Sequence, residues 1–280
     1  MSERFPTPRV VAEEPDAGLR SRMRRFYRDA ADYEAQVAGH DESYFRKYIG
    51  TMVRFVPEGV DGVLELGAGS GAALDGFIEE RRPGRVVGLE LSRTNLAAIH
   101  GRGAPHVAVG GDALELPFAD RSFDLVTCFQ VVEHLPSVQV AIAESLRVLR
   151  RPGYLVVGIP NHASLLTPTQ DLIKGRTRFA FGVADRAGAV RWLAQNLRIC
   201  AGKRLTKEPR YLYREPRLGD DVRGGDSDAV YYACPLDLYR DLAARGAVLL
   251  GTDAAQRWGR WGRLVPAELR GSVVAVWRIG

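Results

Sequence analysis

The sequence predicts an α/β fold with a doubly wound, mostly parallel sheet and an antiparallel final strand. Short apolar runs alternate with amphipathic segments from Val63 to Asn161, which is the pattern of βαβ units. A glycine-rich turn directly follows the first of these runs. The chain then ends in two apolar runs with no convincing helix between them, which favours an antiparallel pair. Its 280 residues, 46% of them hydrophobic, are enough for one large domain with additions.

Residues 1–60 are expected to form an N-terminal helical segment. Asp16 is placed to cap a helix that runs to about Val37, and Asp41 to cap a second helix that ends at Pro57-Glu-Gly59. The first helix contains the densest basic stretch, Arg20 to Arg28, together with apolar residues at helical spacing. We therefore predict that these arginines form a solvated helix face.

The central segment, residues 61–161, is expected to hold the parallel strands. Each strand is an apolar run bounded by turn or helix signals. The clearest intervening helix is Val138–Leu149, which Pro152-Gly153 ends. The predicted strands are Val63–Leu66, Arg85–Leu91, Val107–Val109, Asp124–Phe129 and Tyr154–Ile159.

The rest of the chain divides into an insertion, residues 162–233, and the end of the core sheet, residues 234–280. The insertion is polar and yields one predicted helix, near Asp185–Cys200, from four apolar residues at helical intervals: Val190, Leu193, Leu197 and Ile199. The end of the core is expected to contain one helix and two strands, at Pro235–Arg245, Ala247–Gly251 and Ser272–Trp277.

Composition narrows the class of protein. The net charge is +5, but basic and acidic residues are interleaved, which disfavours a nucleic-acid partner. No apolar run approaches the roughly 18 residues of a membrane span, and the N-terminus has no apolar leader, so we expect a cytoplasmic protein. We expect it to be a monomer or a homodimer. Cys128, Cys200 and Cys234 lack zinc-site spacing and are expected to be reduced, mostly buried thiols.

The sharpest motif is Val63-Leu-Glu-Leu-Gly-Ala-Gly-Ser-Gly71, an apolar strand that runs into a turn with three glycines. Glycines let the backbone pass close to a ligand and adopt positive φ, and the helix that follows offers free N–H donors. The motif predicts a nucleotide-like ligand. On its own it does not separate a nicotinamide cofactor from S-adenosylmethionine, because it also fits the loose dinucleotide pattern.

Three acids narrow the choice of ligand. Glu65 lies inside the first strand, where a buried carboxylate is costly unless it meets hydrogen-bond donors or a cation such as the ammonium of a methionine moiety. Glu90 ends the second strand at the interval expected for an acid that binds ribose hydroxyls; the alternative is a helix cap or a surface acid. Asp112 follows the third strand, where it could accept from the exocyclic amine of adenine.

The stretch from Val63 to Asn161 resembles the class I S-adenosylmethionine-dependent methyltransferases. Besides the glycine motif, the matching segments are, in order, Gly88-Leu-Glu-Leu-Ser92, Gly111-Asp-Ala113, Leu116-Pro-Phe118, Ser122-Phe-Asp-Leu-Val126, Val132-Glu-His-Leu135 and Leu149-Arg-Arg-Pro-Gly-Tyr154. The resemblance implies a Rossmann-like sheet with an N-terminal helical lid and an insertion before the last two strands. It also implies S-adenosylmethionine as the cofactor and S-adenosylhomocysteine as its product.

In that family the strand-end acids and the glycine turn hold the cofactor, and the residues that close the fourth strand line its sulfonium end. The cofactor-binding residues implied by the resemblance are Glu65, Gly67, Ala68, Gly69, Gly71, Glu90, Leu91, Asp112, Ala113, Phe129 and Gln130.

The run from Phe129 to His134 is similar to the Glu-x-x-Glu-His run of ubiquinone-pathway O-methyltransferases, where acids and histidine are associated with a metal. Gln130 replaces the first acid, so we expect no metal site. His134 is a candidate base for an acceptor hydroxyl because its ordinary pKa is near neutrality. The alternative is that Glu133 and His134 only cap the next segment. His162, beyond the fifth strand, is a second candidate base.

Candidate acceptor-binding residues come from both ends of the chain. Tyr27 and Tyr33 resemble aromatic lid positions of small-molecule members of the family, or else they pack in the core. Tyr231, near Asp226-Ser-Asp228, could face the acceptor from the insertion; the alternative is a solvated loop that leads into a strand. Phe129-Gln-Val-Val replaces the Asn/Asp-Pro-Pro-Tyr/Phe run of enzymes that methylate planar nitrogens, which disfavours such an acceptor.

The sequence therefore predicts methyl transfer to a small molecule, first of all to a hydroxyl oxygen of a sugar, phenol or other specialised metabolite. N- or C-methylation of a small molecule is the alternative within enzymes. A cofactor-binding interaction protein without catalysis is an alternative of another class, and the intact glycine turn and acids argue against it. Glu65 and Asp112 disfavour an NAD-linked oxidoreductase.

Overall fold

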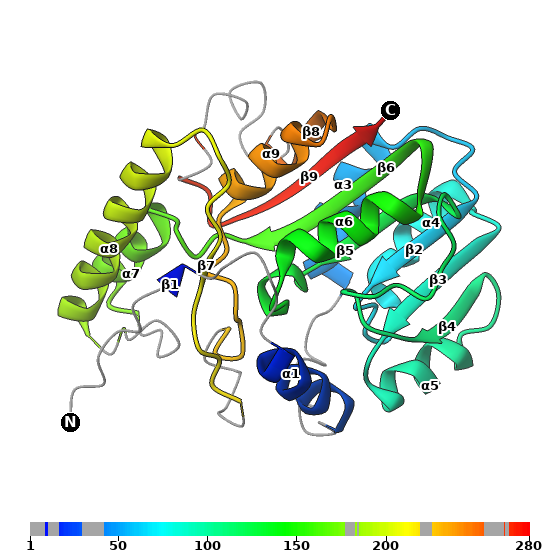
Figure 1. Cartoon of the computed structure of the whole chain (residues 1–280), viewed down its shortest axis with the longest axis horizontal. Coiled ribbons are helices and arrows are strands. Elements are labelled where there is room, and N and C mark those ends of the chain that lie inside the picture. Colours follow the sequence, from blue (N-terminus) through cyan, green and yellow to red (C-terminus); the bar gives the residue numbers. More distant parts are fainter. Residues whose placement is uncertain are drawn as a thin grey trace.

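The computed structural model describes residues 9–10, 17–29, 42–176, 183, 185–218, 226–254, 266 and 269–280. Its centre is a seven-stranded sheet in the order β4-β3-β2-β5-β6-β9-β8 (Figure 1). The strands from β2 to β6 pair in parallel, and β9 runs antiparallel to both of its neighbours. This confirms the predicted sheet. The strands are β2 (Gly62–Leu66), β3 (Arg85–Glu90), β4 (His106–Gly110), β5 (Phe123–Phe129), β6 (Leu149–Pro160), β8 (Val248–Thr252) and β9 (Ser272–Ile279).

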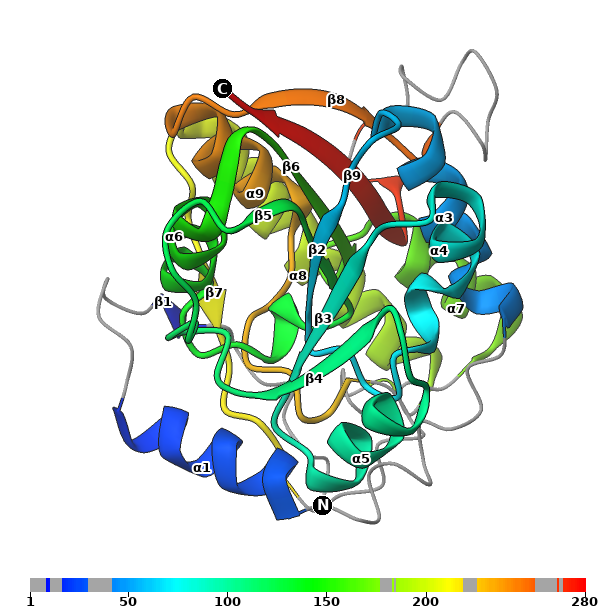
Figure 2. The ribbon, with the colours of Figure 1, turned by 90° about the vertical axis from the view of Figure 1, so that its right-hand side faces the viewer.

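Helices cover both faces of the sheet (Figure 2). Helices α3 (Glu42–Phe55) and α4 (Asp75–Arg81) lie on one face, and α6 (Val138–Val148) and α9 (Pro235–Ala244) on the other. Helix α5 (Arg93–Gly101) packs beside β3 and β4. Neighbouring residues of β2, Val63 and Leu64, are both fully buried but belong to different apolar clusters, one for each face. Burial on both faces explains why the strands read as nearly continuous apolar runs.

The ends of three helices follow directly from the local sequence. Ser92 caps α5 by accepting a hydrogen bond from the Asn95 amide at 3.2 Å. Asp185 caps α8 (Arg186–Leu205) by accepting from the Gly188 amide at 2.7 Å. Pro235 occupies the first turn of α9, where its missing N–H is not needed. The predicted caps Asp16 and Asp41, and the predicted extension to Val37, lie outside the described residues.

The insertion forms a smaller apolar cluster built on α7 (Leu166–Lys174) and α8, which Figure 1 shows beyond the end of β6. The helix predicted near Asp185–Cys200 is present as α8, but two of the four apolar residues that indicated it do not lie on its buried face. Val190 and Leu197 are 50% and 51% exposed, whereas Trp192 and Asn196 are buried. The Asn196 amide donates to the backbone oxygens of His162 and Ser164. A buried amide of this kind is invisible to a search for apolar periodicity, which also missed α7.

Two short strands complete the described elements. β1 (Arg9–Val10) pairs antiparallel with β7 (Leu212–Tyr213), so the start of the chain lies against the insertion. Helix α1 (Ala17–Asp29) follows β1 in sequence and buries Leu19 and Met23. The three cysteines are buried thiols, as expected. Within the described part of the chain, none of the helices has the length and apolar character needed to cross a bilayer.

A buried ion pair joins the insertion to the core. Lys203 of α8 and Asp237 of α9 are 1% and 0% exposed, and Asp237 Oδ2 also accepts from the Tyr231 hydroxyl at 2.8 Å. Removing the cation leaves a buried carboxylate unpaired, so Lys203→Met should lower the free energy of unfolding by about 3–5 kcal/mol in chemical denaturation. Arg22→Met, which breaks the exposed pair with Glu215, should cost less than about 1 kcal/mol. Equal losses in the two variants would contradict a structural role for the buried pair.

Candidate active site

A cavity of about 470 Å³ opens at the carboxyl ends of β2, β3, β4 and β5. This is the edge where ligands bind in doubly wound sheets. Helix α1 covers one side of it, in the place predicted for the N-terminal lid, and Phe45 of α3 also lines it. All the predicted cofactor-binding residues except Gly71 line the cavity, together with His134 and Tyr27: Glu65, Gly67, Ala68, Gly69, Glu90, Leu91, Asp112, Ala113, Phe129 and Gln130.

The glycine turn has the predicted left-handed backbone, with φ of 62°, 54° and 81° at Gly67, Gly69 and Gly71. The three glycines nevertheless do different things. A Cβ on Gly67 would lie 2.4 Å from Cγ2 of Val131, so this glycine is needed for packing. A Cβ on Gly69 would meet nothing within 4 Å, because it would point into open cavity space. Gly71 faces Arg102 instead of the cavity.

Glu65 lies at the base of the cavity and is 2% exposed. Burial, together with the Asp75 and Glu90 carboxylates, raises the pKa of Glu65 to about 8. Arg102 acts in the opposite direction, but it is itself paired with Asp75. A cavity-lining acid in this state fits a cationic ligand group, as expected for an ammonium.

Glu90 ties the end of β3 to the glycine turn. Its Oε1 accepts from the amides of Leu91 at 2.7 Å and Ser92 at 3.0 Å, and its Oε2 accepts from the Gly69 amide at 2.9 Å. The cap of α5 is Ser92, not Glu90. The carboxylate therefore shapes the loop around the cavity that it lines.

Glu90→Ala should weaken binding of S-adenosylhomocysteine by about 1–3 kcal/mol, because charge-assisted hydrogen bonds to the ribose and the loop amides are lost. Calorimetry measures the dissociation constant. The matched control is Glu58→Ala, since Glu58 is an exposed acid that pairs with Arg81 and does not line the cavity. An unchanged dissociation constant for Glu90→Ala would restrict Glu90 to a structural role in the loop.

Asp112 is buried and already engaged on both oxygens. Oδ1 accepts from the Leu114 amide at 2.9 Å, and Oδ2 accepts from Nε of Arg20 in α1 at 2.8 Å. Nε of Arg24 lies 3.7 Å from the same oxygen. The predicted solvated face of α1 is therefore wrong for Arg20, whose acid partner lies 92 residues further along the chain, beyond the reach of helical periodicity.

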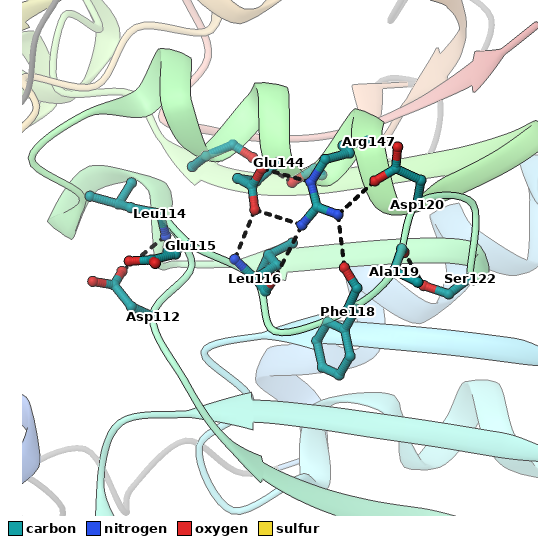
Figure 3. A network of polar contacts seen from close by, with 12 residues as sticks. Asp112, Leu114, Glu115, Leu116, Phe118, Ala119, Asp120, Ser122, Glu144 and Arg147 are labelled. Carbon is teal, nitrogen blue, oxygen red and sulfur yellow. Dashed lines mark hydrogen bonds and ion pairs between the residues drawn. The ribbon is translucent and has the colours of Figure 1, made fainter.

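The loop that carries Asp112 is held by two side chains of α6 (Figure 3). Arg147 donates to the backbone oxygens of Leu116 at 3.0 Å and Phe118 at 2.8 Å, and it pairs with Asp120. Glu144 accepts from the Leu116 amide at 2.8 Å and from Arg147. No helix intervenes between β4 and β5, so these contacts fix the loop in place of a helix.

Phe129 and Gln130 close β5 at the other end of the cavity. Phe129 packs on Tyr48 of α3, with ring centroids 4.6 Å apart. Gln130 has a φ of 55°, a costly conformation for a residue with a side chain, and such conformations cluster at functional sites. Its Nε2 is buried without a hydrogen-bond partner among the described residues. A donor in this state fits a ligand oxygen.

His134 lies in the short helix η2 (Val132–His134) and lines the cavity next to Tyr27, with ring centroids 5.9 Å apart. Burial opposes its protonation, but Asp228, Glu133 and Asp226 more than offset burial, so the pKa of His134 is raised. Burial also raises the pKa of Glu133 to about 8. Among the described residues, no group of three or more histidine, cysteine or acidic side chains has the arrangement of a metal site.

Two other candidate residues, His162 and Tyr231, do not line the cavity. His162 is buried, with its Nε2 2.8 Å from Asp226 Oδ2 and its Nδ1 accepting from the Ala233 amide. Tyr231 is buried in the core, where its hydroxyl contacts Asp237. The loop from Asp226 to Asp228 is only partly solvated, because Asp228 is 2% exposed whereas the Asp226 side chain is 36% exposed. Tyr33 lies outside the described residues.

Residues 64–157 match the family model of a methyltransferase domain. The chain carries a class I S-adenosylmethionine-dependent methyltransferase domain. In this domain, a probable S-adenosylmethionine-dependent methyltransferase of Mycolicibacterium smegmatis is 37% identical over 110 residues, which are 39% of this chain and 41% of the relative. A demethylmenaquinone methyltransferase of Thermobifida fusca is 39% identical over 100 residues, which are 34% of this chain and 42% of the relative. The chain thus spans less than half of the length of these two relatives.

The fold of this methyltransferase domain and its additions is shared with solved structures. The CcbJ methyltransferase of Streptomyces caelestis superposes with a TM-score of 0.53 at 17% identity, over 91% of this chain and 98% of that chain. At this identity the likeness concerns the fold alone, and it confirms the predicted Rossmann-like architecture.

Proposed function

We propose that this protein transfers a methyl group from S-adenosylmethionine to a hydroxyl oxygen of a small molecule, such as a sugar or another specialised metabolite. We further propose that it acts in the cytoplasm as a monomer or homodimer. One observation supports the proposal above all: a single cavity joins the acids suited to the cofactor, Glu65 and Glu90, to a histidine suited to act as a base, His134.

Each of the three acids in the cavity suits a different part of the cofactor. Glu65 would hold the ammonium, Glu90 the ribose hydroxyls, and Asp112 the exocyclic amine of adenine. Because Arg20 already contacts Asp112, the amine would share that carboxylate with the lid. The sulfonium supplies an activated methyl group, so the protein has two remaining tasks, which are alignment of the acceptor and removal of its proton.

His134 suits the second task. It lines the same cavity and follows Phe129 and Gln130 in sequence, and its side chain is 12% exposed. A neutral imidazole at this place can accept the proton of an acceptor hydroxyl. The direct experiment is a methyl-transfer screen of hydroxylated sugars and phenols with labelled cofactor. Transfer to none of them, with transfer to amine or carbon acceptors, would contradict the proposal.

N- or C-methylation of a small molecule is the second candidate. Support for it comes from the similarity to the Thermobifida fusca relative, whose name gives demethylmenaquinone as its acceptor. An amine acceptor depends less on a base than an aliphatic hydroxyl does, because a neutral amine attacks through its lone pair and loses its proton only afterwards, from an ammonium that is more acidic than a hydroxyl. A protein that binds the cofactor but transfers no methyl group in any screen would instead be an interaction protein.

Cofactor binding can be tested without an acceptor. S-adenosylhomocysteine should bind with micromolar affinity, about −8 kcal/mol, and raise the melting temperature, whereas NADH should do neither. Binding of NADH without binding of S-adenosylhomocysteine would overturn the assignment.

The pH dependence of this binding follows from Glu65. Near pH 7 the carboxyl is largely protonated because its pKa is raised to about 8, and a bound ammonium favours the ionised form. Binding should therefore release a proton, and affinity should rise as the pH increases towards 8. Calorimetry in phosphate and in Tris, which differ in ionisation enthalpy, measures the release. Equal enthalpies in the two buffers would remove Glu65 from the ammonium site.

A further inference from the structure

The insertion brings a buried carboxylate to His134. Oδ2 of Asp228 lies 3.4 Å from Nδ1 of His134, and the Asp228 side chain is 3% exposed. This is an ion-pair distance, and Nδ1 makes no hydrogen bond among the described residues. The same oxygen accepts a hydrogen bond from the Tyr27 hydroxyl at 2.7 Å. Tyr27 belongs to α1 and lines the cavity, as His134 does. One oxygen atom thus joins the lid helix, the insertion and the candidate base.

We propose that Asp228 is a positioning residue that holds the His134 ring with Nδ1 towards its carboxylate, and that Tyr27 couples closure of the lid to this pair. The inference rests on the proposed function, in which His134 is the base. With the Nδ1 proton directed at Asp228, the neutral ring keeps its lone pair on Nε2, the nitrogen left to accept the proton of an acceptor.

The charged surroundings of His134 come from three further residues. Glu133 precedes it in η2, with Oε1 3.8 Å from Nε2 of His134. Asp226 lies in the same loop as Asp228 but contacts His162. Arg214, which follows β7, donates to the backbone oxygens of Asp226 and Ala229 and so fixes the loop. Asp228 differs from these groups because its carboxylate contacts both His134 and the lid.

Tyr27 and Asp228 should act on His134 in opposite directions. The carboxylate stabilises the protonated ring, so it raises the pKa of His134. The tyrosine hydrogen bond stabilises the same carboxylate and weakens its attraction for the ring. Closure of the lid therefore increases the fraction of neutral His134 at a given pH, at the moment when the acceptor must lose its proton.

The test is an NMR titration of the histidine rings in the full chain without ligand, with the His134 signal assigned by its loss in His134→Gln. Asp228→Asn should lower the pKa of His134, and Tyr27→Phe should raise it. Tyr211→Phe removes another buried tyrosine–aspartate hydrogen bond, to Asp241 at 2.7 Å, and should leave this pKa unchanged. The His162 signal shows whether the surrounding packing is intact.

Turnover provides a second readout. Asp228→Asn should lower kcat by about 10–10²-fold, with a KM for S-adenosylmethionine within about twofold of wild type, and should move the rising limb of the pH profile to lower pH. Tyr27→Phe should move that limb to higher pH.

An unchanged His134 pKa in Asp228→Asn, or shifts of the same sign in both variants, would overturn the coupling. Should Asp228→Asn fail to fold, a Tyr27→Phe variant with an unchanged or lowered pKa overturns it equally. Opposite shifts in a protein without methyl transfer would preserve the coupling and reject the proposed function.

Discussion

Replacement of His134 by alanine should lower turnover by about 10²–10⁴-fold while leaving the affinity for S-adenosylhomocysteine nearly intact. An aliphatic hydroxyl gains little acidity before it attacks, so a base held near it has a large effect. The ring lines the cavity but is not one of the groups proposed to hold the cofactor, so cofactor affinity should not depend on it. A phenol or amine acceptor should show a smaller loss. The measurement is steady-state turnover on an identified acceptor, with affinity from calorimetry.

The same experiment carries a pH signature. The base must be neutral, so wild-type turnover should rise with pH through the pKa of His134. That pKa lies above the ordinary histidine value, because Asp228, Glu133 and Asp226 more than offset the effect of burial. In His134→Ala this limb should be lost. A variant with wild-type turnover and an unchanged profile would leave His134 as a structural residue.

Gly69→Val should abolish measurable binding of S-adenosylhomocysteine, a loss of at least about 10²-fold in affinity, in a protein that still folds. Gly69 has a φ of 54°, which a branched side chain resists, and its missing Cβ faces open cavity space. Valine would occupy the space of the ligand. Gly67→Val should also fail to bind, but its clash with Val131 disturbs the fold, so Gly69 is the sharper test.

The chain offers a matched control for Gly69→Val. Gly175, at the end of α7, has a φ of 64°, and a Cβ there would likewise meet nothing within 4 Å. Gly175→Val should therefore impose similar backbone strain far from the cofactor residues and leave affinity unchanged. Retained binding in Gly69→Val, or an equal loss in both variants, would show that the turn is only structural.

The core of the fold could be predicted because its signals are local. The central parallel strands are buried on both faces, so their apolar runs stand out, and the turn after β2 carries its three glycines in five consecutive residues, 67–71. The start of β6 was missed because Pro152-Gly153 was interpreted as a break, whereas the strand already begins at Leu149. The buried face of α8 could not be predicted from local signals, because it contains Asn196 and Lys203, whose partners are distant in sequence.

The candidate site divides in the same way. The residues that line the cofactor end follow the carboxyl ends of successive strands, and the topology alone brings these ends together. The acceptor end depends on Tyr27 and Asp228, which are 201 residues apart, so no local pattern links them. His162 lies at the predicted sheet edge, but its ring turns to Asp226, and only the side-chain contacts show this.

The chain leaves the sheet after Pro160, at the end of β6, and returns to it at Val248, where the edge strand β8 begins; β9 then pairs between β8 and β6. The conformational entropy lost on closing a flexible loop grows only with the logarithm of its length, about 0.6 kcal/mol for each doubling. Lengthening or exchanging the segment that begins after Pro160 should therefore change the folding free energy of the sheet from β2 to β6 very little. Acceptor preference in a protein of this design is free to diversify by insertion, while the glycine turn and the strand-end acids stay under separate and stricter constraint.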